Sequence, residues 1–166
     1  VLQEEAASGP LLALYFIAGA ASLPLWVQLA ARYGRVVAWL LAIALSIAAF
    51  AGASRLGSGD LWPFAAICLA SGLALGADLA LPVAIAADLG ERQGQAGACF
   101  GVWNLVAKLN LALAAGLSLP LIGALGYVPG GDTGLAALVF AYALLPLAFK
   151  LLAGGLLWRW RLSLEL

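Results

Sequence analysis

Apolar residues fill five long stretches of this chain. A helix needs about 20 of them to cross the ~30 Å hydrocarbon core of a bilayer. The five stretches cover about 11–31, 36–53, 61–87, 96–124 and 134–158. Because lipid offers the backbone no hydrogen-bond partners, each stretch is expected to be helical. The sequence therefore predicts an all-α, polytopic membrane protein whose five transmembrane helices form one membrane domain over residues 11–158.

The composition supports a membrane protein and excludes several classes of function. Only 10% of the residues are charged, against about 25% in soluble domains, so too little polar surface exists to coat a globule in water. The 166 residues contain no histidine, which excludes imidazole bases and His-ligated metals. Cys68 and Cys99 form no CxxC pair, and no enzyme motif occurs. We expect no enzyme activity, cofactor or metal site, and the zero net charge predicts no binding to nucleic acid.

Arginines between the apolar runs predict how the chain is oriented. Five of them occur in the first loop, the third loop and the tail, which five spans place on one side: Arg32, Arg35, Arg92, Arg159 and Arg161. The other side carries Arg55. The positive-inside rule then places the tail (159–166) in the cytoplasm and the N-terminal segment (1–10) outside the cell membrane. An N-terminus outside, without a signal sequence, suggests that preceding helices are missing.

Lys108 lies near the middle of the fourth run, too deep for its side chain to reach the surface easily. An intramembrane charge costs at least about 2.5–3.5 kcal/mol on insertion scales and usually faces the bundle interior or water. Asn104 lies one turn earlier on the same face, and Trp103 flanks that face. An indole can stack on a pyranose while the polar groups bind its hydroxyls, so these residues could bind sugar. Alternatively, Lys108 pairs with an aspartate and ties two helices together.

Asp78 lies inside the third run, one turn before Pro82, which lacks the N–H that would bond to residue 78. A carboxylate beside such a weakened turn can line a cavity or carry a proton. Equally, Asp78 could pair with Lys108 or with Lys150. Lys150 in the fifth run is expected to be structural, reaching toward the core or extending along its stem to the surface.

Asp88 is expected at the cytoplasmic end of the third run, as a solvated helix end or as part of a gate. In the gate, Asp88 pairs with Arg32, Arg35 or Arg92 when the cytoplasmic side is shut.

Two pairs of glycines have GxxxG spacing, a pattern that permits close approach of helices. They are Gly72 with Gly76 and Gly97 with Gly101.

One segment resembles a known family. "LPVAIAADLGERQGQAGACFGVWNLVAKLNLALAAGLSLPLIGALGYVPG" is similar to the closing region of the glycoside–pentoside–hexuronide:cation symporters, the melibiose-carrier-like branch of the major facilitator superfamily. "LPLWVQLAARYGR" resembles the eighth helix of that family and the basic loop behind it. The resemblance is most specific over 78–128. It implies that the five runs correspond to helices 8–12 of a major facilitator fold.

The resemblance also implies roles for particular residues. Lys108 falls where the family has a mid-membrane lysine near the cation and sugar sites, and Trp103 and Asn104 fall at positions facing the sugar. The Trp–Asn combination differs from the Gln–Thr of the melibiose carrier. Asp88 matches an aspartate of the cytoplasmic charge lock. The family's cation-binding carboxylates lie on N-terminal helices, outside this chain.

The expected function is therefore the C-terminal part of a secondary transporter in the cell (inner) membrane. It would couple uptake of a sugar or glycoside to Na⁺ or H⁺ and be inactive without the missing N-terminal half. Two alternatives remain open at this point. One is a facilitator-fold carrier of a lipid or drug, and the other is a small non-transporting membrane subunit.

Overall fold

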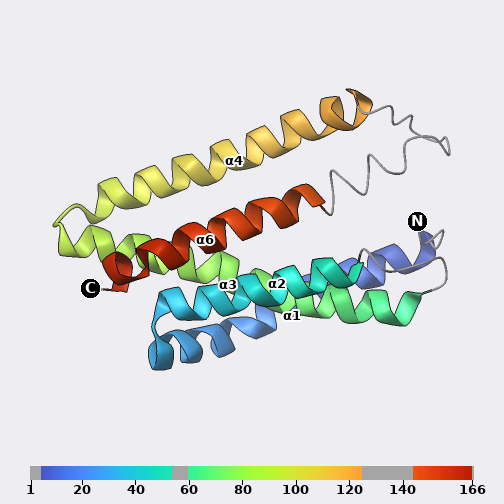
Figure 1. The fold of residues 1–166 in the computed structure, drawn as a ribbon, viewed down its shortest axis with the longest axis horizontal. Helices are drawn as coiled ribbons and strands as arrows, with labels where there is room; N and C mark the ends of the chain where they lie inside the picture. Colours follow the sequence, from blue (N-terminus) through green and yellow to red (C-terminus); the bar gives the residue numbers. More distant parts are fainter. Residues whose placement is uncertain (1–4, 54–59, 125–143, 166) are drawn as a thin grey trace. The chain divides into compact units, whose positions relative to one another are not determined.

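The computed structural model describes residues 5–53, 60–124 and 144–165, and helices account for nearly all of them (Figure 1). The helices are α1 (Glu5–Tyr33), α2 (Arg35–Ala53), α3 (Leu61–Arg92), α4 (Ala96–Ala124) and α6 (Leu145–Glu165). The predicted all-α fold is confirmed. Four helices, α1 to α4, are long and apolar enough to cross a membrane. The chain divides into two compact units, Val1–Ile85 with Lys150–Leu166 and Ala86–Phe149, which are described separately.

Helix boundaries differ from the predicted spans at three places. Helix α1 already begins at Glu5, six residues before the predicted span, and α3 continues to Arg92 instead of ending near residue 87. Asp88 consequently lies inside the last turns of α3. Part of the predicted fifth span, 134–143, lies outside the described residues, and α6 extends past residue 158 to Glu165. Helical geometry does not stop where apolar residues stop, because charged residues continue a helix readily.

Glycines terminate α1 and α3 where the backbone takes a left-handed conformation. Gly34, the residue between α1 and α2, has φ of 89°, and its N–H donates to Ala30 O at 2.9 Å. Gly94, just after α3, has φ of 65°. Other residue types pay a steric cost at such angles. Two short turns at these glycines therefore reverse the chain.

The core of the first unit packs one tryptophan of α1 against small and medium side chains of α2 and α3. Its buried cluster contains Trp26, Ala38, Ala42, Ala77 and Leu81. Alanines in such a cluster let helix backbones approach closely, which is how membrane helices gain packing energy without a hydrophobic driving force. Helix α6 contacts α2, since a Cβ on Gly154 would lie 3.3 Å from Ile43 Cγ2.

One GxxxG pair forms the closest approach between α1 and α3. A Cβ on Gly72 would lie 2.4 Å from Tyr15 O, and one on Gly76 would lie 2.6 Å from Gly19 O. By contrast, a Cβ on Gly97 or Gly101 of α4 would meet no described atom within 4 Å. The same spacing thus serves helix packing on α3, whereas α4 presents its two glycines to open space.

This difference makes a prediction about stability. Gly72→Ala should destabilise the protein by about 2 kcal/mol, because the new methyl group forces apart two backbones already in contact. Gly101→Ala is the matched control and should be neutral or slightly stabilising, since alanine favours helix over glycine. Thermal unfolding in detergent measures both. Equal midpoints for the two variants would contradict the α1–α3 contact.

Candidate functional site

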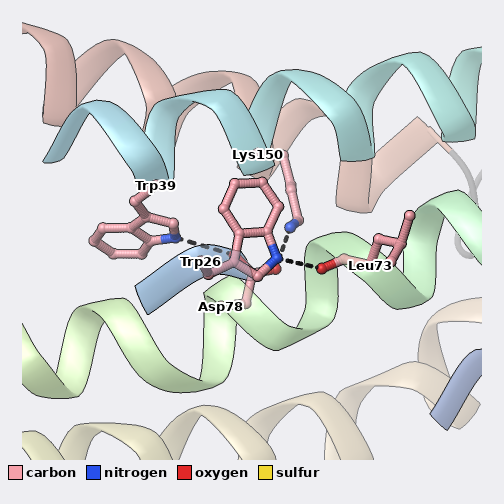
Figure 2. A network of polar contacts seen from close by, with 5 residues as sticks. All are labelled: Trp26, Trp39, Leu73, Asp78 and Lys150. Carbon is pink, nitrogen blue, oxygen red and sulfur yellow. Dashed lines mark hydrogen bonds and ion pairs between the residues drawn. The ribbon is translucent and has the colours of Figure 1, made fainter. Parts of the chain in front are cut away.

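Two side chains of opposite charge meet between the helices of the first unit (Figure 2). Lys150 Nζ of α6 forms an ion pair and hydrogen bond with Asp78 Oδ2 of α3. The other carboxylate oxygen, Asp78 Oδ1, accepts a hydrogen bond of 3.0 Å from Trp39 Nε1 of α2. Three helices therefore converge on one carboxylate, and both of its oxygens have nitrogen donors.

A second set of polar contacts attaches α3 to α1 close to Asp78. Trp26 Nε1 donates to Leu73 O at 2.7 Å, as Figure 2 shows. The Ser22 hydroxyl lies 3.0 Å from the same carbonyl and 2.8 Å from Gly19 O. Both Trp26 and Ser22 are buried. Because an indole N–H in an apolar setting needs an acceptor, these bonds fix the α1–α3 crossing and hold the turn of α3 that precedes Asp78.

The environment of Asp78 is mostly apolar, but it is not sealed. Ala74, Ala77 and Leu81 on α3 are at most 2% exposed. The side chains of Lys150 and Asp78 retain 24% and 30% of their exposure. Tyr15 of α1 interacts electrostatically with Asp78. The pair is therefore partly exposed at the side of an otherwise apolar helix cluster.

The sequence left three interpretations open for Asp78, and pairing with Lys150 is the one found. Lys150 accordingly reaches toward the core. Sequence reasoning did not identify Trp39 as a partner of the carboxylate. The available signal was an indole within the second apolar run, which had to find an acceptor somewhere.

The predicted sugar-binding residues lie on α4 in the second unit, and they do not share one pocket. Asn104 and Lys108 are exposed, and Asn104 Nδ2 donates to Phe100 O of its own helix at 2.9 Å. Trp103 is half-buried. It lines an open apolar pocket of about 390 Å³ formed with Leu89 of α3 and Cys99 of α4. Lys108 is therefore available to groups outside this unit, and its role in binding stays a prediction.

The predicted gate residues occur near helix ends. Asp88 is half-buried in α3, and Arg92 is exposed at the end of that helix. The Arg32 guanidinium lies 5.7 Å from the centre of the Tyr33 ring, and Arg35 Nη1 donates to Ala84 O at 3.0 Å. Pairing between Asp88 and an arginine stays a prediction.

No group of three acidic, histidine or cysteine side chains that could hold a metal ion is found over residues 5–53, 60–124 and 144–165.

Comparison with known proteins decides the family. A family model described as MFS/sugar transport protein matches residues 1–164. The chain belongs to the MFS/sugar transport family. No curated protein and no solved structure gave a match.

Membership in this family confirms the major facilitator part of the sequence interpretation, and it makes the protein a membrane protein of a transporter family. Asp78 and Lys108 lie in helices that are long and apolar enough to cross a membrane, and Lys150 of α6 pairs with Asp78. Such charges commonly mark the paths of substrates and ions. The melibiose-carrier-like branch within the family stays a prediction.

Proposed function

We propose that the chain forms the C-terminal part of a secondary transporter that couples uptake of a sugar-like solute to a cation by alternating access. The observation that carries the proposal is the match to the sugar-transport family over residues 1–164. Substrate sites in such folds lie near the bilayer midplane, at the interface between two helical halves. The partner of this chain is then the N-terminal half of the transporter, together with helix 7. The five runs resemble helices 8–12 of the melibiose-carrier-like branch.

Helix α4 supplies the solute-binding side chains in this proposal. Lys108 and Asn104 are both exposed on it, and each can donate hydrogen bonds to sugar hydroxyls. Trp103 offers an aromatic face for the apolar side of a pyranose ring. Trp103 lines an open apolar pocket, so its contribution would be stacking on the sugar ring, while the hydrogen bonds come from Asn104 and Lys108 outside that pocket.

The orientation proposed from the arginines is supported by their positions in the first unit. The α1–α2 turn, with Arg32 and Arg35, lies at the same end of this unit as the last turns of α6, with Arg159 and Arg161 (Figure 1). A positive end of this kind faces the cytoplasm in the cell membrane. In the proposed gate, Asp88 pairs with Arg32, Arg35 or Arg92 when the cytoplasmic side is shut.

Fluorescence of Trp103 tests the proposed function. Titrating the complete protein with a panel of glycosides should quench part of its tryptophan emission, because a bound pyranose changes the environment of that indole. The chain has six tryptophans, so Trp103→Phe is the control that isolates the signal. The quenching should also depend on Na⁺ or on acidic pH. If no glycoside alters the emission, or Trp103→Phe quenches equally, the sugar site on α4 is wrong.

A further inference from the structure

The outer face of α6 changes in character along the helix. Leu157 is buried, and Gly154 and Lys150 lie one and two turns before it on the same side, where they meet α2 and α3. The remaining sides of the helix before residue 158 carry leucines that are more than half exposed: Leu151, Leu152 and Leu156. From residue 158 onward these outer sides carry tryptophan and arginine instead.

Residues 158–161, with the sequence Trp-Arg-Trp-Arg, mark the level at which this face leaves the hydrocarbon core. Trp158 and Trp160 are 59% and 56% exposed. They flank Arg159, which is exposed and lies about 200° around the helix from Leu157. Tryptophan is enriched where membrane meets water, because its ring is apolar and its N–H is polar. An arginine that faces away from the helix bundle needs headgroups or water, so this segment belongs at headgroup level.

Arg161 brings a second positive charge to the same place. It is half-buried, and its guanidinium carbon lies 4.0 Å from the centre of the Trp158 ring. At this distance the cation is attracted to the face of the indole. Because Trp158 lies between Arg161 and Arg159 around the helix, the stack holds the two arginines on neighbouring sides of one tryptophan.

The end of the first unit that carries this segment is positive. The α1–α2 turn, with Arg32 and Arg35, lies at the same end as the last turns of α6 (Figure 1). Residues 32–35 and 158–166 together contain four arginines and one acidic residue, Glu165. A basic cluster at a membrane surface attracts anionic lipids. A zwitterionic headgroup is attracted less, because it carries a cation of its own.

We propose that residues 158–161 of α6 bind the headgroup of an anionic phospholipid. Arg159 and Arg161 hold the phosphate, since the donors of a guanidinium match two oxygens of a phosphate group. Trp158 and Trp160 lie at the level of the glycerol backbone, and the exposed leucines before them meet the acyl chains. The site is separate from the residues proposed for solute binding and for the gate, and it does not depend on the transported solute.

Bromine-labelled lipids test the site, because bromine on an acyl chain quenches nearby tryptophans. The whole chain in phosphatidylcholine nanodiscs receives a small fraction of brominated phosphatidylglycerol or of brominated phosphatidylcholine. The phosphatidylglycerol should quench more. This preference should fall about fivefold for each arginine removed, and the double variant Arg159→Gln with Arg161→Gln should lose nearly all of it. Arg159→Lys with Arg161→Lys keeps both charges and should keep most of the preference.

Trp62 provides a matched control at the other end of the unit. It is 85% exposed in the first turn of α3. Residues 62–84 span about 33 Å at the rise of an α-helix, and Ala84 is the residue whose carbonyl binds Arg35 of the α1–α2 turn. The excess quenching by phosphatidylglycerol should therefore diminish in Trp160→Phe and persist in Trp62→Phe.

Three results would overturn the lipid site. The first is equal quenching by the two brominated lipids, or an excess that the double glutamine variant retains. The second is loss of the excess on adding soluble glycerol phosphate, which would indicate a site for free phosphate esters. The third is a Trp160 that neither lipid quenches in the complete transporter, which would show that protein covers this face. Each of these results leaves the proposed sugar transport untouched.

Discussion

Lys108→Ala in the complete transporter should weaken solute binding roughly 10- to 100-fold and abolish accumulation. Hydrogen bonds from a charged donor contribute about 1.5–3 kcal/mol, which corresponds to that range. Lys108 is exposed in mid-α4, and no polar or charged partner of its side chain is found among the residues described. In the proposed function its ammonium group binds the solute. Uptake of radiolabelled glycoside into cells or vesicles measures the effect, with immunoblotting to confirm that the variant reaches the membrane.

Two control variants sharpen this prediction. Lys108→Arg keeps the charge and should retain partial binding, because the guanidinium differs from the ammonium in shape and donor geometry. Asn110→Ala changes a polar residue about 200° around the same helix and should leave transport nearly unchanged. Normal accumulation by Lys108→Ala would remove this lysine from the mechanism.

The second large effect concerns stability. Lys150→Ala should lower the stability of the helix bundle by about 3 kcal/mol, because it leaves the Asp78 carboxylate without its opposite charge in a mostly apolar setting. Trp39 alone then supports the carboxylate. The side chains are partly exposed, so the loss should fall at the lower end of what buried pairs show. Thermal or denaturant unfolding in detergent measures it.

Lys108→Ala is the matched control for this measurement, since it removes an exposed lysine from another helix and should leave the midpoint nearly unchanged. The double variant Asp78→Asn with Lys150→Met should recover much of the lost stability, because neither side chain then carries an unpaired charge. If Lys150→Ala were as stable as the wild type, the ion pair would have no structural role.

The helices could be predicted because two local properties of the chain decide them. One is the transfer of apolar side chains from water to lipid, and the other is hydrogen bonding between nearby backbone groups. Runs such as 36–53 and 96–124 correspond to α2 and α4, since twenty apolar residues in lipid have no alternative to a helix. The ends were less predictable. Helix α3 continues past its apolar residues to Arg92 and stops where Gly94 turns the chain.

The candidate site was predictable in kind but not in detail. An aspartate and two lysines within apolar runs had to find partners or water, and the sequence named both lysines as candidates for Asp78. The sequence did not reveal the hydrogen bond from Trp39 to Asp78. A tryptophan fits an apolar helix whether or not its indole N–H meets a carboxylate.

For this protein, the sequence by itself determined that the chain is helical, that it belongs in a membrane, and which few charges lie inside it. Only the tertiary structure decided that Lys150 pairs with Asp78, and that Gly72 and Gly76 form a helix contact while Gly97 and Gly101 do not. The physical reason is that the transfer of apolar side chains into lipid and the periodicity of a helix depend on residues close together in the sequence. Pairing and close packing depend on which faces of distant helices meet.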